Sequence, residues 1–251
     1  MARSRASIGG LLLKAFAAAS IASAVYVLWL PDVAALKRHP PKTTAFIEYR
    51  RAALKAQGKP FHPKMVWTPY DRISDNLKHA VITAEDDQFY RHHGVDWDNM
   101  KVALEKDWQL KRPAYGASTI TQQLARNLYL SPSKNPLRKL KELLIARRLE
   151  DTLGKRRILE LYLNVAEFGN GLYGAEAASQ AYFGKHASEL GVEEAVALAV
   201  ILPSPRRHNP AKGGKYVERN MKRVMDRMRA SGYLPQDESL TSLEQTGVIT
   251  P

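Results

Sequence analysis

Residues 73–94 read ISDNLKHAVITAEDDQFYRHHG, and this stretch decides the fold class. Its apolar residues recur at the spacing of one helix face, at Ile73, Leu77, Ala80, Val81 and Ala84. Helical spacing dominates the rest of the chain as well, and we find no convincing run of period-two alternation. The sequence therefore predicts an all-α (mainly α) domain over residues 40–233, followed by a polar tail over residues 234–251.

Five further segments carry the helical pattern. Asn135 and Pro136 form a start signal for a helix with a leucine stripe at Leu137, Leu140 and Leu144 that runs until Gly154. Other helices are expected from the stripe Ile158, Leu159, Tyr162 and Leu163, over 174–183, and over the nearly all-apolar segment 192–201. The last long helix is marked by Val217, Met221, Val224, Met225 and Met228 and ends at Gly232.

Composition limits the class of protein. The chain has 251 residues, enough to bury a sizeable core, and a formal net charge of +13. The absence of Cys excludes disulfides, thiolate metal sites and cysteine nucleophiles. The positive charge predicts an anionic partner, which charge alone leaves open among nucleic acid, phospholipid headgroups and a phosphorylated or carboxylated substrate.

The N-terminal segment predicts a membrane anchor. Residues 8–30 are apolar apart from Lys14, and as a helix they would be about 34 Å long, enough for a hydrocarbon core of about 30 Å. Arg3 and Arg5 place residues 1–7 in the cytoplasm as a short tail. The alternative is a signal peptide cleaved after residues 22–24, but the apolar run continues beyond that site. An anchored chain would lie outside the cytoplasm, which weighs against nucleic acid.

Two short patterns match known motifs without their structural context. Residues 169–174 fit G-x-G-x-x-G, but they follow a helix in a chain without predicted parallel strands, so we expect a glycine-rich turn between helices. Neighbouring His92 and His93 lack a third ligand at metal-binding spacing, so no metal site is assigned.

Three segments carry candidate chemistry. Glu85 and Asp86 follow an apolar stripe, where a carboxylate shielded by apolar neighbours suits a general base; a solvated acidic pair is the alternative. In residues 116–127, Ser118 is the expected N-cap of a helix whose start would face an anion, or of an ordinary capped helix. Residues 138–142, RKLKE, combine three cations with one carboxylate, or form a plain surface salt bridge.

Together these segments resemble the peptidoglycan glycosyltransferases, glycosyltransferase family 51. The family motifs E-D-x-x-F-x-x-H-x-G, G-x-S-T-I-x-x-Q-L and R-K-x-x-E all occur here in order. A fourth, K-x-x-I-L-E-x-Y-L-N, matches residues 155–164, and G-x-x-A-A matches 174–178. The resemblance covers about residues 43–210 and implies a lysozyme-like, two-lobed domain behind a single N-terminal transmembrane helix. No transpeptidase domain follows the match, so we expect the monofunctional type.

The resemblance implies a mechanism. Family members polymerise lipid II into β-1,4-linked glycan strands, with inversion and release of undecaprenyl diphosphate. Glu85 would be the general base, and Glu142 the second carboxylate that orients the site or assists at the donor diphosphate. Arg126, Arg138 and Lys139 match positions expected to hold that diphosphate. The other substrate-binding positions implied are Asp86, Phe89, His92, Ser118, Thr119, Gln122, Gln123 and Asn127.

The resemblance also implies partners and a location. No cofactor is required, although a divalent cation, Mg or Mn, assists some members. The expected partners are lipid II, the growing glycan chain and membrane lipid, with cell-wall synthesis and division proteins as candidates and no nucleic acid. The enzyme would sit in the cytoplasmic (inner) membrane as a single-pass protein, with its N-terminus in the cytoplasm and its catalytic domain on the periplasmic side.

Three questions stay open at this point. Trp97, Val102, Leu104, Trp108 and Leu110 either dip into the bilayer surface or belong to the core. A lytic enzyme with a lysozyme-like carboxylate is the closest rival function; it would need an acid for the leaving oxygen, whereas a diphosphate leaves unaided. A non-catalytic anchored scaffold that binds anionic lipid or cell-wall polymer is the rival from another class.

Overall fold

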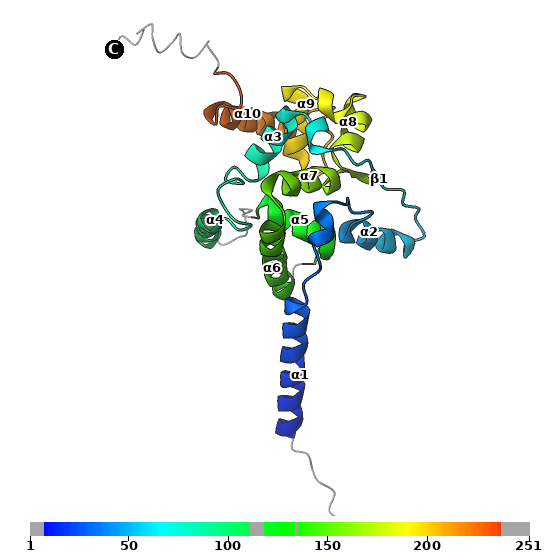
Figure 1. Cartoon of the computed structure of the whole chain (residues 1–251), viewed down its shortest axis with the longest axis vertical. Helices are drawn as coiled ribbons and strands as arrows, with labels where there is room; N and C mark the ends of the chain where they lie inside the picture. The colour runs from blue at the N-terminus through cyan, green and yellow to red at the C-terminus, as the bar shows by residue number, and fades with distance from the viewer. Residues whose placement is uncertain (1–7, 111–117, 134, 237–251) are drawn as a thin grey trace, which may run out of the picture. The chain divides into compact units, whose positions relative to one another are not determined.

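The computed structural model describes residues 8–110, 118–133 and 135–236 (Figure 1). The predicted cytoplasmic tail over 1–7 and most of the predicted polar tail lie outside these ranges. The chain divides into two compact units. The first contains the described residues up to Pro60 and those from His92 to Ile158, and the second contains Phe61–Arg91 and the described residues from Leu159 onward.

Helices make up the first unit. In chain order they are α1 (Ile8–Leu28), η1 (Ala34–Lys37), α2 (Ala45–Lys55), α4 (Trp97–Leu110), α5 (Ile120–Tyr129) and α6 (Pro136–Thr152). Within α1, Gly10–Leu28 is long and apolar enough to cross a membrane, and almost all of it is exposed (Figure 1). The helix expected over residues 8–30 is therefore present. A membrane anchor and a signal sequence both form a helix of this kind, so the structure alone does not separate them.

The last turns of α1 pack against α6. Val27 is buried there, and the Lys141 Nζ lies 4.3 Å from the centre of the Tyr26 ring, a cation–π geometry. Further along the chain, the Arg157 Nε donates to the Leu36 carbonyl oxygen at 2.7 Å. The end of the apolar helix is thus held against α6, and the segment that follows it is tied to Arg157.

Helix α6 buries a different face from the predicted one. Asn135 caps it as expected, accepting from the Leu137 N–H at 2.8 Å, but Leu137 and Leu140 are exposed. The buried face contains Arg138, Glu142, Ile145, Ala146 and Leu149 instead. The predicted leucine stripe is therefore wrong as the packing face, because polar partners from α5 cover the other side of the helix.

Helix α4 does not belong to the core. Trp97 and Trp108 are 66% and 86% exposed, and Val102 and Leu110 are also exposed. Among the described side chains of α4, only Ala103 is buried. The core alternative is therefore wrong for these four residues, while the Leu104 side chain lies outside the described part of the chain.

The second unit is built around a buried helix. Its elements are η2 (Tyr70–Arg72), α3 (Asp75–Glu85), most of α7 (Lys155–Val165), α8 (Ala175–Phe183), η3 (Ala187–Glu189), α9 (Val192–Ile201) and α10 (Lys215–Ala230). Helices α3 and α10 pack on α9, which is buried from Ala195 to Ile201. The predicted central helix and last amphipathic helix are thus confirmed, and α10 ends before Gly232 as expected.

The chain is mainly helical, which confirms the predicted fold class, and this unit also contains a small sheet that the sequence did not indicate. β1 (Lys64–Met65), β3 (Leu172–Tyr173) and β2 (Glu167–Gly169) form it in that order, with β1 parallel and β2 antiparallel to β3. Strands of two or three residues are too short to show alternation, which is why the sequence concealed them. The glycine-rich segment forms the β2–β3 turn between α7 and α8. This confirms the prediction of a glycine-rich turn between helices in place of a nucleotide-binding loop.

Asn164 and Gly174 hold this sheet to α7. The fully buried Asn164 accepts from the Thr68 N–H at 2.7 Å and donates to the Thr68 carbonyl oxygen at 2.9 Å. Gly174 has φ +85°, and a Cβ there would lie 2.6 Å from the Asn164 carbonyl oxygen. Only glycine fits this close approach.

We therefore expect Gly174→Ala to destabilise the protein more than the matched change Gly184→Ala. Gly184 also has positive φ but has open space around it. Both changes cost about 1–2 kcal/mol of backbone strain, or about 2–8 °C in the thermal midpoint. Only Gly174→Ala adds a backbone clash, so its midpoint should fall further in a thermal melt of the full-length protein. Equal losses would contradict the packing described here.

Candidate active site

The first unit places the second motif at the start of α5. The predicted N-cap, Ser118, is displaced by one residue, because the Thr119 hydroxyl accepts from the Gln122 N–H at 3.1 Å. The same hydroxyl donates to the Gly94 carbonyl oxygen at 2.7 Å, which ties α5 to the last residue of the first motif. Because its hydroxyl serves the backbone, Thr119 is a structural cap, and it is 3% exposed.

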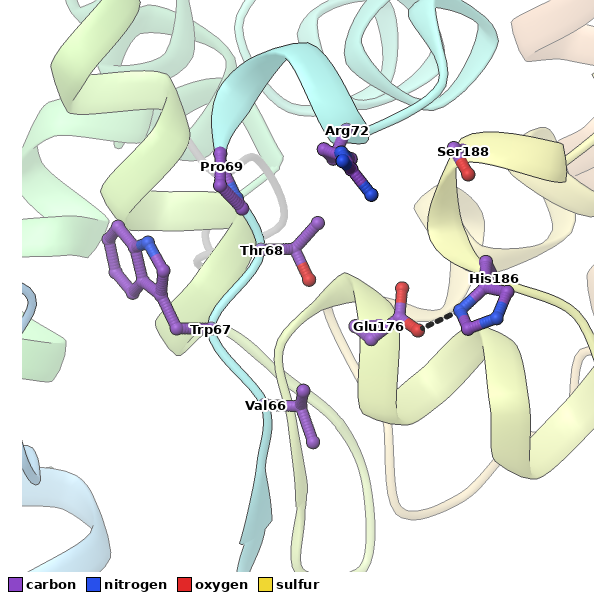
Figure 2. Close-up of a pocket in the computed structure, with 8 residues that line it drawn as sticks. All are labelled: Val66, Trp67, Thr68, Pro69, Arg72, Glu176, His186 and Ser188. Carbon is purple, nitrogen blue, oxygen red and sulfur yellow. Dashed lines mark hydrogen bonds and ion pairs between the residues drawn. The ribbon is translucent and has the colours of Figure 1, made fainter.

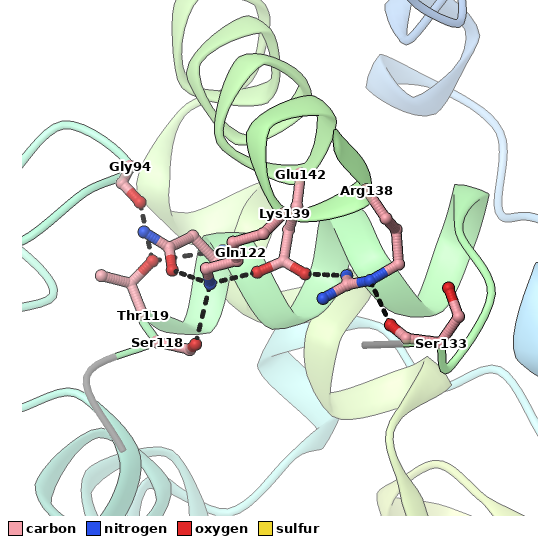
Figure 3. Close-up of polar contacts among 8 residues, drawn as sticks. All are labelled: Gly94, Ser118, Thr119, Gln122, Ser133, Arg138, Lys139 and Glu142. Carbon is pink, nitrogen blue, oxygen red and sulfur yellow. Dashed lines mark hydrogen bonds and ion pairs between the residues drawn. The ribbon is translucent and has the colours of Figure 1, made fainter. Parts of the chain in front are cut away.

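Lys139 connects the second and third motifs. Its ammonium group donates to the Ser118 hydroxyl at 3.0 Å, to the Gln122 Oε1 at 3.0 Å and to the Glu142 Oε1 at 2.5 Å (Figure 3). An ammonium group has three donors, so these contacts use all of them. The loop before α5 and the first turns of α6 are therefore joined at one cation.

Glu142 is the centre of this polar cluster. Its carboxylate is 2% exposed and also accepts from the Arg138 guanidinium, whose Nε donates to the Ser133 carbonyl oxygen at 2.6 Å. The surface-salt-bridge alternative is therefore wrong, since both oxygens of a buried carboxylate are held by cations. Counting Arg138 and Lys139 against Glu142, the cluster keeps one net positive charge.

Two donors beside the cluster have no partner among the described residues. They are the Nε2 of Gln122, a fully buried side chain, and the buried Nε of Arg126. Gln122 and Arg126 lie four residues apart on α5 and so on one face, as predicted. Buried donors are normally satisfied, so this face suits a ligand rich in acceptor oxygens. Gln123 and Asn127, on the same helix, are partly buried.

A second buried carboxylate supports the same helices, and sequence reasoning missed it. The Glu150 Oε1 accepts from the Thr121 hydroxyl at 2.6 Å and from the Lys155 Nζ at 2.7 Å. Gly94, with φ +86°, packs so closely that a Cβ would lie 3.2 Å from the Glu150 Cγ. Glu150 directly follows the buried Ile145–Leu149 stripe of α6. An acidic residue on a buried helix face was the sequence signal that could have identified it.

The second unit carries Glu85 at the end of α3. Glu85 is the last helical residue and is half-buried, as the pattern predicted. Asp86 leaves the helix with φ −165° while its N–H still donates to the Ile82 carbonyl oxygen at 2.8 Å. Beyond it, the Asp87 carboxylate pairs with Arg227 of α10 at 3.0 Å. The loop after Glu85 is thus fixed at both sides.

Phe89 needs a correction. It was expected at the substrate, yet it is 0% exposed and its N–H donates to the Asp86 carbonyl oxygen at 3.0 Å. Its ring lies edge-on to Tyr90, with centroids 5.1 Å apart. In this structure Phe89 supports the loop from within, and a contact with substrate stays a prediction.

The two units thus hold different parts of the motif set. Glu85, Asp86 and Phe89 belong to the second unit, whereas His92, which is partly buried, and the residues of the second and third motifs belong to the first. Within the described residues, no group of three or more His, Asp or Glu side chains is arranged to hold a metal ion. Metal dependence stays a prediction.

Known proteins match over the same part of the chain. The family model for transglycosylases matches residues 53–229. The biosynthetic peptidoglycan transglycosylase of Aromatoleum aromaticum is 48% identical over 205 residues, covering 81% of this chain and 89% of the relative. Those of Azoarcus sp. and Chromobacterium violaceum are 46% and 42% identical, covering 82% and 87% of this chain and 88% and 96% of the relatives.

The family match contains the α5–α6 cluster and the loop after Glu85 alike. This confirms the resemblance that the four motifs indicated. The chain belongs to the transglycosylase family, glycosyltransferase family 51, and is a peptidoglycan glycosyltransferase.

Proposed function

We propose that this glycosyltransferase polymerises lipid II into β-1,4-linked glycan strands and releases undecaprenyl diphosphate. The carrying observation is the buried Glu142 carboxylate that holds Arg138 and Lys139 beside the unmet donors of Gln122 and Arg126. A lipid-borne diphosphate is an acceptor-rich anion. A net positive cluster with unmet donors beside it suits such an anion, because positioned cations stabilise the charge that develops on the leaving group.

Glu85 is the proposed general base. The 4-hydroxyl oxygen of the acceptor's terminal sugar attacks the anomeric carbon of the donor, and its proton passes to Glu85. As this bond forms, the bond between that carbon and the diphosphate oxygen breaks, and the electron pair leaves with the diphosphate. Direct displacement inverts the configuration. The end of α3 supports this role, since it presents a half-buried carboxylate on a fixed loop.

Glu142 acts as a positioning residue in this proposal. At 2% exposure and with both oxygens engaged by cations, it has little surface for a substrate. Its role is to hold the Arg138 guanidinium and the Lys139 ammonium in place. Of these two cations, Lys139 is the more accessible, with 36% of its side chain exposed against 11% for Arg138.

The anchor and the membrane are part of the proposal. We infer that α1 is a single-pass anchor in the cytoplasmic membrane, with the N-terminus inside and the catalytic units on the periplasmic side. The exposed tryptophans and aliphatic side chains of α4 support contact with the bilayer surface. Because the end of α1 packs on the first turns of α6, the cation cluster would lie near the lipid headgroups, where a lipid-linked diphosphate resides.

Two further parts of the proposal concern activities and partners. The relatives, of which this chain covers 88–96%, are named only as transglycosylases, which supports polymerisation without peptide cross-linking. Cell-wall synthesis and division proteins remain the proposed protein partners. Two assays separate the rival functions from the proposed one. A lytic enzyme would release soluble fragments from sacculi, and a scaffold would form no polymer from lipid II.

Glu85→Gln should abolish polymerisation while leaving the fold intact. Removing a general base typically costs about 10²–10⁴-fold in rate, because the attacking hydroxyl keeps its proton. Polymer formation from lipid II in detergent measures this, with Glu193→Gln, an exposed acid on α9, as the control. A fully active Glu85→Gln enzyme would overturn the proposed role.

Glu142→Gln should destabilise the protein and weaken lipid II use. The change leaves two cations without their anion, and breaking a buried pair costs about 3–5 kcal/mol. The matched control is Glu48→Gln, which breaks an exposed Glu–Arg pair in the same unit and should lower the midpoint far less, because solvent screens an exposed pair. Thermal midpoints and lipid II KM report the two effects. Equal midpoints for the two variants would refute the central position of Glu142.

Arg126→Ala should raise the KM for lipid II, and more at low salt than at high salt. Salt screens a charge–charge attraction, so the guanidinium contributes most when the ionic strength is low. Arg148→Ala removes an exposed cation from α6 and serves as the control. An increase in KM that is the same at both salt concentrations would argue against a charge role for Arg126.

A further inference from the structure

The second unit contains a cavity that the proposed reaction does not use. It has a volume of about 410 Å³ and lies between the segment that leads from β1 through η2 and the α8–η3 region (Figure 2). Arg72, on its wall, comes just before α3, whereas Glu85 ends that helix. Eleven residues of helix span about 16 Å, so the cavity is separate from the loop after Glu85.

One side of the cavity is a fixed ion pair. The buried Glu176 carboxylate accepts from the His186 Nδ1 at 2.7 Å, from the Gln180 amide at 2.6 Å and from the Ala187 N–H at 2.8 Å. These contacts occupy both carboxylate oxygens, so Glu176 has little left to offer a ligand. They leave the Nε2 side of His186, an exposed residue, toward solvent.

The pair favours a charged histidine. The hydrogen bond to Glu176 and its negative charge raise the pKa of His186, with a further contribution from Glu189 of η3. Burial would raise the pKa of Glu176, but the hydrogen bonds from Ala187, His186 and Gln180 together lower it below its usual value. Below the raised pKa of His186, this side of the cavity therefore offers an imidazolium N–H donor.

Arg72 supplies a second cation. Among the described residues, its guanidinium has no ion-pair partner within 4.0 Å. Figure 2 shows the end of this side chain and the Thr68 hydroxyl directed into the space that the Glu176–His186 pair borders. The Ser188 hydroxyl also lines this space, and Val66 and Pro69 give it apolar surface. Trp67 lines it too, but Figure 2 shows its indole ring directed away from the Glu176–His186 pair.

Charge and shape together select the ligand. Two cations, Arg72 and protonated His186, border this space, while Glu176 is occupied by its own hydrogen bonds and Glu189 lies beside His186. The local charges therefore balance, which suits a monoanion better than a phosphate dianion. A guanidinium fork and adjacent hydroxyls fit the two oxygens of a carboxylate. The apolar surface beside them fits the short aliphatic side chains of a peptide.

We propose that this cavity binds a carboxylate of the stem peptide on the glycan strand, through Arg72 and His186. The inference rests on the proposed function for the identity of the peptide, because the glycan substrate is what would bring that peptide to this unit. It adds a second contact to the polymer, away from the reacting sugars.

Peptide binding to the full-length protein in detergent micelles tests this directly. The probes are the free stem pentapeptide, the same peptide with its carboxylates amidated, and an unrelated peptide of L-amino acids with a free C-terminus. Calorimetric titration should show at least tenfold weaker binding of the amidated peptide. Arg72→Gln should weaken binding of the free-acid peptide by at least tenfold. The control is Arg207→Gln, which changes an exposed arginine of the same unit outside the cavity and should leave binding unchanged.

A pH series gives the second readout. His186 is faced by Glu176 of α8, Glu189 of η3 and Arg72 of η2, and of these groups it is the one that titrates near neutrality. Because its charged form binds the carboxylate, affinity should be full at acidic pH and fall as pH rises through the raised pKa. His186→Gln should flatten this profile.

The outcomes separate the inference from the proposed function. Equal binding of acid and amide, or unchanged binding by Arg72→Gln, would overturn the carboxylate site even if lipid II is polymerised. Equal binding of the unrelated L-peptide would overturn the assignment to the stem peptide. Failure of the wild-type protein to polymerise lipid II, with peptide binding intact, would instead contradict the proposed function.

Discussion

The first unit depends on one buried carboxylate that holds two cations. Glu142 is almost fully buried, and without Arg138 and Lys139 its charge could not be kept there, since burying an unpaired charge is costly. Glu142 also fixes the orientation of the two cations, because each of its carboxylate oxygens accepts from one of them. Lys139 in turn holds Ser118 and Gln122 in place through hydrogen bonds from its ammonium group. The positive surface that would meet a diphosphate is therefore rigid before any ligand arrives.

The surrounding scaffold serves this cluster. Thr119 ties the start of α5 to Gly94, and Glu150 joins Thr121 to Lys155, so hydrogen bonds fix these parts of the first unit to one another. The end of α1 lies on α6, with Tyr26 under Lys141. In the proposed function, this arrangement would bring the cluster close to a lipid-linked substrate.

Much of this could be predicted from the sequence, and the failures have physical reasons. Helical periodicity identified α3, α9 and α10, and the family motifs indicated the polar residues that α5 and α6 bring together. The role of Glu85 stays a prediction. The pattern failed on α6, where a polar cluster rather than the leucine stripe is buried, since periodicity assumes that apolar faces pack inward. It also missed strands of two or three residues and the burial of Phe89. The Arg72 cavity joins segments a hundred residues apart, which no local pattern reveals.

The most direct measurement is an experimental structure of the full-length protein with an unreactive lipid-linked diphosphate sugar bound. The account predicts the diphosphate oxygens within hydrogen-bond distance of the Lys139 ammonium and of the free donors of Gln122 and Arg126, with Glu142 still buried behind them. A diphosphate bound elsewhere, with Lys139 and Arg138 still closed on Glu142 and Gln122 still unpaired, would contradict it.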